Sequence, residues 1–140
     1  MASTVQVIQD VYQAFGQGDI PRVLAHFHPT IEWRLAEGHP YSPEGRPWCG
    51  PEAIARHFFS RAGGEWEGFT VSPRQLHDAG DTVVLECRYT GVYKPTGRRL
   101  DAQACHVWKV SNGKVTSFQQ YIDTARLQDV MGMDRVVRGQ

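Results

Sequence analysis

The chain has 140 residues, with 15 basic and 15 acidic side chains, so its formal net charge at pH 7 is zero. This length suits one hydrophobic core, and we expect a single domain over residues 1–133 and a short tail over residues 134–140. Because neither sign of charge gathers into a run, the sequence argues against a nucleic-acid partner.

Hydrophobic segments are short throughout the chain. None approaches the roughly 18 to 20 consecutive apolar residues of a membrane span, and residues 1–10 lack the basic and then apolar pattern of a signal peptide. We therefore predict a cytoplasmic protein without a membrane partner. The three cysteines, Cys49, Cys87 and Cys105, lie far apart, which predicts free thiols rather than a zinc or redox site.

The sequence predicts neither a metal nor a cofactor. His26 and His28 lie two residues apart without a third ligand nearby, whereas zinc sites use three or four protein ligands. The P-loop, GxGxxG and GxSxG motifs are also missing, so no nucleotide-binding loop or nucleophile elbow is predicted.

The first segment predicts two helices. Behind a capping box formed by Ser3 and Gln6, apolar residues recur at steps of three and four, the period of one helix face. These residues are Val5, Ile8, Tyr12 and Phe15. We expect this helix to end near Gly16, and a second short helix to begin at Asp19 and to be ended by Pro29.

A strand, a loop and a third helix are predicted next. Residues 30–35 alternate apolar and polar side chains, the period of a half-buried strand. Residues 36–50 contain three prolines and three glycines, which predicts a long surface loop of the kind that often carries function. A helix then begins at Pro51 and is closed by Gly63 and Gly64. Its apolar side holds Ile54, Phe58 and Ala62.

Four strands and a short helix complete the chain. The strands are expected at residues 66–76, 82–93, 98–110 and 114–122. Their connections are short, so neighbouring strands should pair antiparallel, and Asn112-Gly113 is the strongest hairpin signal. The final helix should begin at Asp123 or Thr124 and end near Met131.

This order of elements predicts an α+β fold in which the helices cover one face of a sheet. Strands of about twelve residues in so small a sheet must twist and curl. A curled sheet backed by helices leaves a hollow at its open end, where we expect a small-molecule pocket.

Four local sequences carry a family resemblance. They are Phe15-Gly16-Gln17-Gly18-Asp19, Ile31-Glu32-Trp33 after His28-Pro29, Gly50-Pro51-Glu52-Ala53-Ile54, and the ending from Val107-Trp108-Lys109-Val110 through Asn112-Gly113-Lys114-Val115 to Tyr121-Ile122-Asp123. In these features the sequence resembles the SnoaL-like and ketosteroid-isomerase-like branch of the nuclear transport factor 2-like superfamily. The resemblance implies a cone-shaped fold with a strongly curved antiparallel sheet, helices on its concave face, and a homodimer.

At the catalytic positions of the family, this sequence matches some of the residues and differs at others. Steroid isomerases place a tyrosine on the first helix, a base aspartate on the first strand and a protonated aspartate on the penultimate strand. The nearest positions here are Tyr12, Trp33 and His106. Polyketide cyclases use an aspartate on the last long strand and a histidine on the strand before it, positions that match Gln120 and His106. Because an indole and an amide replace carboxylates, neither mechanism is supported as such.

His106 is the first candidate catalytic residue. Alternation along residues 98–110 places it in an apolar row with Trp108. A histidine on such an inward face can act as a general acid or base near neutral pH. The alternative is a buried histidine satisfied by a backbone carbonyl or by Tyr12. We expect burial to lower its pKa unless a carboxylate stands close, which leaves it neutral at pH 7.

Tyr12, Gln120 and Asp123 complete the candidate catalytic set. Gln120 should face His106, either as a fixed group that contacts the substrate or as a simple network partner of the histidine. Asp123 precedes the last helix, where an acid/base role competes with a helix-capping role that we favour.

Aromatic residues supply the expected ligand-binding surface. In the loop over residues 36–50, Tyr41 and Trp48 could stack on a flat ligand while His39 or Arg46 contacts a carbonyl or carboxylate. The loop could equally pack on the surface or form part of a dimer contact. The candidate ligand-binding residues are Phe15, Trp33, Tyr41, Trp48, Phe58, Trp108 and Phe118.

Two functions stay open at this stage. The first is a cofactor-independent isomerase, cyclase or dehydratase acting on a small, largely apolar cyclic or carbonyl compound, with His106 moving the proton and Tyr12 and Gln120 orienting the substrate. The second is a non-catalytic ligand-binding or dimerisation module that uses the same pocket. The expected partners are a small-molecule ligand and a second copy of the chain, joined through the outer face of the sheet.

Overall fold

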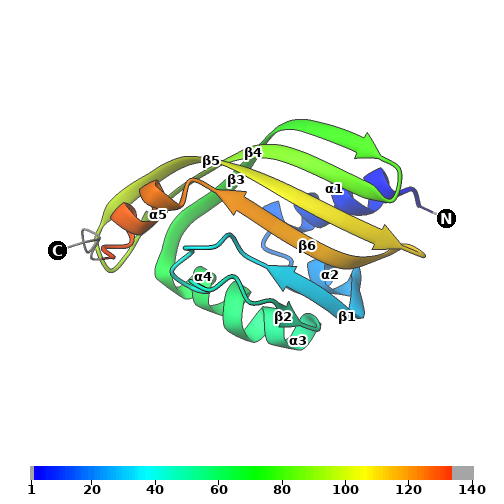
Figure 1. Cartoon of the computed structure of the whole chain (residues 1–140), viewed down its shortest axis with the longest axis horizontal. Helices are drawn as coiled ribbons and strands as arrows, with labels where there is room; N and C mark the ends of the chain where they lie inside the picture. The colour runs from blue at the N-terminus through cyan, green and yellow to red at the C-terminus, as the bar shows by residue number, and fades with distance from the viewer. Residues whose placement is uncertain (1, 134–140) are drawn as a thin grey trace.

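The computed structural model describes residues 2–133, so the predicted tail over residues 134–140 lies outside the described residues. The helices and strands follow the predicted α+β order (Figure 1), except that the segment 36–50, predicted to be a loop, contains a two-residue strand at its end. In chain order they are α1 (Thr4–Gly16), α2 (Ile20–Ala25), β1 (Phe27–Arg34), β2 (Trp48–Cys49), α3 (Pro51–Ile54), the π-helical turn η1 (Ala55–Phe59), α4 (Ser60–Glu65), β3 (Trp66–Ala79), β4 (Thr82–Tyr93), β5 (Arg98–Ser111), β6 (Lys114–Ile122) and α5 (Thr124–Val130). No helix in this range is both long and apolar enough to cross a membrane.

Within residues 2–133 the strands form an open six-stranded sheet in the order β2-β1-β6-β5-β4-β3. The prediction that β4, β5 and β6 pair as consecutive antiparallel strands is confirmed. Between β5 and β6, Asn112 and Gly113 have φ angles of 51° and 76°, the left-handed conformation that a two-residue hairpin favours. β1 runs parallel to β6, an exception within the otherwise antiparallel sheet for which the sequence made no prediction. Strands far apart in sequence are free of the short turn that enforces antiparallel pairing.

The first strand begins earlier than predicted. α2 ends at Ala25 and β1 starts at Phe27. Pro29, which was expected to end the helix, lies inside the strand, where the register between β1 and β6 shifts between Phe27 and Glu32. A proline has no N–H to donate, and such an interruption of the hydrogen-bond ladder tolerates it.

α1 presents a wider apolar face than the predicted stripe. Ile8 is fully buried, whereas Val5, Tyr12 and Phe15 are half-buried and pack at the margin of the core. The other buried residues of the helix are Val7, Val11 and Ala14. A helix that lies across a curved sheet buries a broad apolar face. The single row of apolar residues predicted from the sequence is therefore only part of the buried face.

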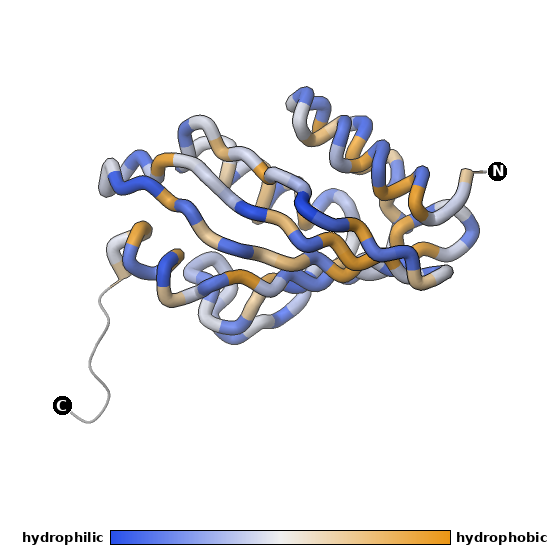
Figure 2. Tube along the Cα trace, turned by 90° about the horizontal axis from the view of Figure 1, so that it is seen from above, coloured by the Kyte–Doolittle hydropathy of each residue, from blue (hydrophilic) through white to orange (hydrophobic). Residues whose placement is uncertain are grey.

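The long strands give the sheet an apolar inner face and a polar outer face. Buried and exposed residues alternate along β4 and β5, and Figure 2 shows the matching change of hydropathy along the strands. The predicted inner row of β5 is buried throughout: Leu100, Ala102, Ala104, His106, Trp108 and Val110. In Figure 1 the helices α1 to α4 lie on one side of this sheet, which places the core between the two layers.

The third predicted helix is a continuous helical segment, residues 51–65, whose middle turn η1 is π-helical. Gly63 and Gly64 lie inside its last part rather than closing it, and the chain passes directly from Glu65 into β3. Phe58 and Phe59, although consecutive, both pack against the core. In a regular α-helix neighbouring side chains point about 100° apart, and a π-helical turn, which is frequent at functional sites, changes that spacing.

A polar cluster ties α1 to α2. The Arg22 guanidinium donates from Nε and Nη2 to the Asp10 carboxylate, with 3.1 Å between Nε and Oδ2. His26 Nε2 lies 2.6 Å from Asp10 Oδ2. Hydrogen bonds from Arg22 and then from His26 lower the pKa of Asp10 from 3.8 to about 2. The cluster therefore favours the ionised carboxylate in the folded protein.

Asp10→Asn is expected to lower the Tm at pH 6, and the difference from wild type should shrink as the pH falls. The folded pKa is the lower one, so the stabilisation is fully present above the unfolded pKa of 3.8 and is lost as the pH falls toward about 2. Thermal unfolding by circular dichroism at several pH values between 6 and 2.5 measures this. Glu52→Gln, which removes an exposed ion pair with Arg56, is the control and should barely change the Tm. A difference that is equal at every pH would contradict the prediction.

Candidate functional site

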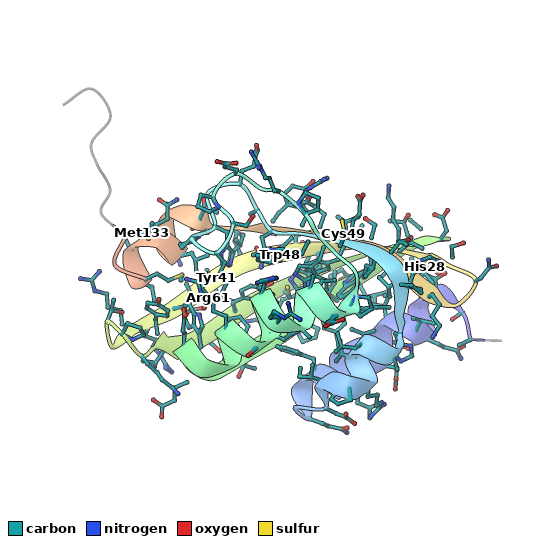
Figure 3. All side chains as sticks on the ribbon, turned by 90° about the horizontal axis from the view of Figure 1, so that it is seen from below. His28, Tyr41, Trp48, Cys49, Arg61 and Met133 are labelled. Carbon is teal, nitrogen blue, oxygen red and sulfur yellow. The ribbon has the colours of Figure 1, made fainter. Side chains whose placement is uncertain are left out.

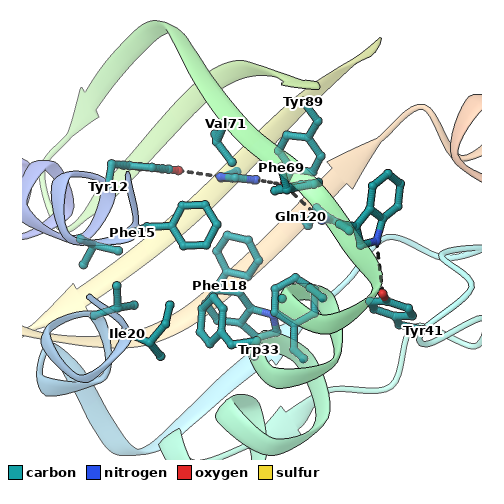
Figure 4. Close-up of a pocket in the computed structure, with 18 of the residues that line it drawn as sticks. Tyr12, Phe15, Ile20, Trp33, Tyr41, Phe69, Val71, Tyr89, Phe118 and Gln120 are labelled. Atoms are coloured by element: carbon teal, nitrogen blue, oxygen red, sulfur yellow. Dashed lines mark hydrogen bonds between the residues drawn. The ribbon is translucent and has the colours of Figure 1, made fainter. Parts of the chain in front are cut away.

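A largely apolar cavity of about 350 Å³ lies between the inner face of the sheet and the helices (Figure 4). Its walls come from α1, α2, the helical segment 51–65, the loop after β1, strands β1 and β3 to β6, and α5. None of the described residues that line it is an aspartate, glutamate, lysine or arginine. A ligand would meet aromatic rings and a few neutral polar groups, which is typical of small-molecule sites.

Strand register builds an aromatic floor for this cavity. Trp33 on β1, Phe118 on β6 and Trp108 on β5 lie opposite one another across neighbouring strands. The Trp33 and Phe118 rings stack with their centroids 3.8 Å apart, and the centroids of Phe118 and Trp108 are 4.5 Å apart. Side chains directly opposite on one sheet face come within contact distance, so strand pairing fixes the floor.

The next row of the same face holds His106 opposite Gln120, as strand alternation predicts. The histidine is 4% exposed. The Tyr12 hydroxyl lies 2.6 Å from Nδ1, and the Tyr89 hydroxyl is hydrogen-bonded to Nε2 (Figure 4). Burial lowers the pKa of His106 to about 3. The imidazole is therefore neutral at pH 7, as expected for a buried ring without a carboxylate beside it.

Each of the two tyrosine hydroxyls also accepts a hydrogen bond from a second side chain. Trp108 Nε1 donates to the Tyr12 hydroxyl at 2.7 Å, and Gln120 Nε2 donates to the Tyr89 hydroxyl at 3.2 Å. Gln120 Oε1 accepts from the Ala36 backbone N–H at 3.3 Å, which fixes the orientation of the amide. Gln120 is thus linked to His106 by hydrogen bonds through the Tyr89 hydroxyl. We call the five side chains of Trp108, Tyr12, His106, Tyr89 and Gln120 the tyrosine–histidine network.

Tyr41, in the loop between β1 and β2, closes another wall of the cavity. Its hydroxyl donates to Glu65 Oε1 at 2.8 Å and accepts from Trp66 Nε1 at 3.2 Å. The Arg61 guanidinium lies 4.0 Å from the centre of the Tyr41 ring, and Figure 3 shows the two residues side by side. Because Glu65 takes the hydroxyl hydrogen, Tyr41 offers the cavity a ring surface.

His39 lines the cavity next to Tyr41. Its Nδ1 accepts from the Tyr41 backbone N–H at 3.1 Å, and burial lowers its pKa to about 3. In a neutral imidazole whose Nδ1 accepts, the hydrogen is on Nε2. Arg46, the other predicted polar contact of this loop, is outside the lining and pairs with Glu44 on the surface.

Besides Arg46, Trp48 and Asp123 lie outside the cavity lining. Trp48, on the edge strand β2, stacks on His57 and packs against Phe58. Asp123 accepts from the Arg126 backbone N–H at 3.1 Å and caps α5, the role that the sequence favours. The structure brings the other candidates together around the cavity: Tyr12, Phe15, Trp33, Tyr41, Phe58, His106, Trp108, Phe118 and Gln120.

Tyr89 is the main lining residue that the sequence analysis did not single out. It shares the buried face of β4 with Cys87, so strand alternation carried the signal. Phe69 and Val71 of β3 and Phe59 of η1 also line the cavity without having been predicted. The position of Phe59 depends on the π-helical turn, which no sequence period indicates.

Trp33 carries the one buried side-chain N–H without a hydrogen-bond partner within residues 2–133. Aromatic rings surround its indole, with ring centroids 5.6 Å away at Phe58 and 5.4 Å at Phe59. An N–H directed at an aromatic face is a weak substitute for a hydrogen bond. At this position the first strand therefore offers the cavity an aromatic ring in place of a carboxylate.

The described range holds no group of three or more histidine, cysteine, aspartate or glutamate side chains suited to a metal ion. His26 is hydrogen-bonded to Asp10, and His28 Nδ1 accepts from the Thr30 backbone N–H at 3.1 Å. The three cysteines are free thiols, as predicted.

Comparison with known proteins identifies the family. A family model described as a SnoaL-like domain matches residues 8–118. A solved structure of a nuclear transport factor 2-like protein from Burkholderia thailandensis is 36% identical, with a TM-score of 0.88, over 94% of this chain and 98% of that one. Among curated proteins, none matches this chain.

Two more distant structures share the fold. TerC, co-crystallised with polyporic acid, is 24% identical with a TM-score of 0.82, over 94% of this chain and 99% of that one. A protein with a ketosteroid isomerase-like fold from Catenulispora acidiphila, in complex with trimethylamine, is 17% identical with a TM-score of 0.76, over 91% and 92% of the two chains. With the family match spanning most of its length, this chain belongs to the SnoaL-like family of the nuclear transport factor 2-like superfamily.

Proposed function

We propose that this protein binds a small, largely apolar cyclic or carbonyl compound in its cavity and moves a proton on that compound without a metal or cofactor. The hydrogen-bonded chain Tyr12–His106–Tyr89, set in an otherwise apolar cavity, carries this proposal. Isomerisation, cyclisation or dehydration through an enol or enolate needs only a positioned proton acceptor and donor.

His106 is the proposed proton carrier. Its neutral imidazole has one nitrogen that accepts and one that donates, so it can take up and return a proton in one place. Burial raises the pKa values of Tyr12 and Tyr89. Both hydroxyls therefore stay protonated and can polarise a carbonyl group in the cavity.

Ligands of two relatives support a small-molecule site. TerC was crystallised with polyporic acid, and the protein from Catenulispora acidiphila holds trimethylamine. The volume of about 350 Å³ found here is within the range of roughly 300 to 1,000 Å³ usual for ligand pockets. We propose a ligand of this size, with a single ring or two fused rings.

A non-catalytic binding module is the second candidate, and one observation favours it. Both ring nitrogens of His106 are already hydrogen-bonded to tyrosines, and no described lining residue is a carboxylate. A base of this kind is weaker than the aspartate of the steroid isomerases. For a binding module, His106→Ala would lower ligand affinity and change no rate.

We further propose a cytoplasmic homodimer joined through the outer face of the sheet. On this face Tyr121 of β6 is 56% exposed and lies opposite Cys105 of β5. Exposed tyrosines are enriched at protein interfaces. Light scattering at tens of micromolar protein should give the mass of a dimer, and a monomer mass would contradict this proposal.

The proton-transfer role predicts catalysed hydrogen exchange on a ketone that fits the cavity. The probe is 1-tetralone, a flat two-ring ketone, and loss of its C2 hydrogens into D2O is followed by NMR. Wild type should accelerate the exchange over buffer, and His106→Ala should reduce the acceleration by about 100-fold or more, the usual contribution of a general acid or base.

The control for this experiment is Asp123→Asn. Asp123 lies outside the cavity and asparagine is also a good helix cap, so exchange should match wild type. The Tm of His106→Ala shows whether the fold survives. A wild-type protein that binds 1-tetralone without accelerating exchange would favour the binding module.

The neutral state of His106 also predicts a dependence of stability on pH. Its folded pKa of about 3 is below the unfolded value of 6.5, so the unfolded chain binds the proton first. The free energy of unfolding should be highest above pH 6.5 and should fall below it by up to about 1.4 kcal/mol per pH unit from this residue. His106→Gln should remove that part of the slope in urea titrations between pH 7 and 5, whereas the exposed His57→Gln should retain it. An unchanged slope in His106→Gln would show that the pKa of His106 in the folded protein is close to its unfolded value of 6.5.

A further inference from the structure

The tyrosine–histidine network has more hydrogens than internal acceptors. His106 contacts two hydroxyl groups, Tyr12 at Nδ1 and Tyr89 at Nε2. Each contact needs one hydrogen. The two hydroxyls and the neutral imidazole together carry three hydrogens for these two contacts.

The outer partners cannot take the third hydrogen. Trp108 reaches Tyr12 with an indole N–H, which only donates. Gln120 reaches Tyr89 with its amide nitrogen, because its amide oxygen already accepts from the Ala36 backbone N–H. Among the described residues, neither hydroxyl has an acceptor other than His106.

One hydroxyl hydrogen is therefore left over in both tautomers of His106. If Nε2 carries the imidazole hydrogen, Tyr12 donates to Nδ1 and the hydrogen of Tyr89 is left over. If Nδ1 carries it, Tyr89 donates to Nε2 and the hydrogen of Tyr12 is left over. A protonated imidazole would donate to both oxygens and leave both hydroxyl hydrogens over, so each protonation state offers at least one.

Both hydroxyl-bearing residues line the cavity (Figure 4). A buried donor without an acceptor costs on the order of 1–3 kcal/mol, and a ligand oxygen in the cavity removes that cost. We infer that the natural ligand carries a neutral oxygen acceptor, a ketone or quinone carbonyl on a flat ring system, which takes the hydrogen left over by the Tyr12–His106–Tyr89 chain. This inference rests on the proposed small-molecule function and specifies the chemical class of its ligand.

The acceptor must be neutral because the cavity offers nothing to balance a charge. No described lining residue is a lysine or arginine. The two lining histidines, His39 and His106, are buried, and burial lowers the pKa of each to about 3. A carboxylate or phosphate would lose its hydration without gaining a cation. The aromatic floor formed by Trp33, Phe118 and Trp108 instead matches a flat ring.

The same chain could convert a bound ketone to its enol in a balanced step. The Tyr89 hydroxyl gives its hydrogen to the carbonyl oxygen, and His106 Nε2 gives its hydrogen to the Tyr89 oxygen. Tyr12 gives its hydrogen to His106 Nδ1 and takes the proton that leaves the α-carbon. The C–H electron pair forms the C=C bond, the C=O π pair forms the new O–H bond, and the chain is left in its other tautomer.

The test compares 1-tetralone with tetralin, which has the same ring skeleton without the carbonyl. Calorimetry measures the Kd of both probes for wild type, Tyr12→Phe and Tyr89→Phe. Tyr93→Phe is the matched control, because the Tyr93 hydroxyl bonds Glu65 and the residue is outside the lining. Side-chain ¹⁵N NMR of His106 adds a direct measure of the ratio of its tautomers.

At least one of the two cavity variants should bind 1-tetralone about 3- to 10-fold more weakly, the loss of one net hydrogen bond, and should bind tetralin within about 2-fold of wild type. Tyr93→Phe should change neither affinity. Addition of 1-tetralone should shift the tautomer ratio of His106, because a bound carbonyl selects the tautomer that frees its donor. Addition of tetralin should leave the ratio unchanged.

Two results would overturn the inference. One is an unchanged Kd for 1-tetralone in both cavity variants, and the other is an equal loss for ketone and hydrocarbon, which marks a purely structural role of the hydroxyls. A wild-type protein that binds neither probe would instead contradict the proposed function itself, on which the inference rests.

Discussion

The cost of burying charge is the constraint on which this site depends. The described residues that line the cavity include no aspartate, glutamate, lysine or arginine, and desolvation keeps His106 neutral and the Tyr12 and Tyr89 hydroxyls protonated. The polar groups are therefore held by hydrogen bonds alone. In so apolar a setting a polar hydrogen without an acceptor is costly. The direction of every donor in the network thus determines which chemistry the cavity can accept.

Strand register places this network where a ligand can reach it. The pairing of β5 with β6 sets His106 opposite Gln120 and sets Trp108 opposite Phe118 in the adjoining row. α1 then brings Tyr12, 94 residues away in sequence, to the free side of the imidazole. A shift of one residue in register would turn His106 to the outer face. The position of His106 is therefore a property of the whole sheet.

Strand alternation was the sequence signal that located most of the site. It placed His106, Trp108 and Gln120 on the inner face, and the same period would have found Tyr89 had it been applied to β4. It could not reveal that β1 runs parallel to β6, because that pairing joins segments without a short connecting turn. The side chain of Phe59 faces the cavity because of the π-helical turn, and Trp48 lies outside the cavity because of the way the edge strand packs. Neither feature produces a periodic pattern in the sequence.

Trp33 explains why the chemistry of related folds does not transfer directly to this protein. It stands on the first strand at the position that resembles the base aspartate of the steroid isomerases, yet its indole is packed on Phe118 and between phenylalanine rings. A carboxylate there would be surrounded by apolar groups and would favour its protonated form. The large ring instead fills the cavity floor and favours a flat ligand. Trp33 is the residue of the first strand among the described residues that line the cavity, so this strand supplies no carboxylate there. The proposed proton transfer therefore runs through the Tyr12–His106–Tyr89 chain, whose two hydroxyls both belong to residues of the cavity wall.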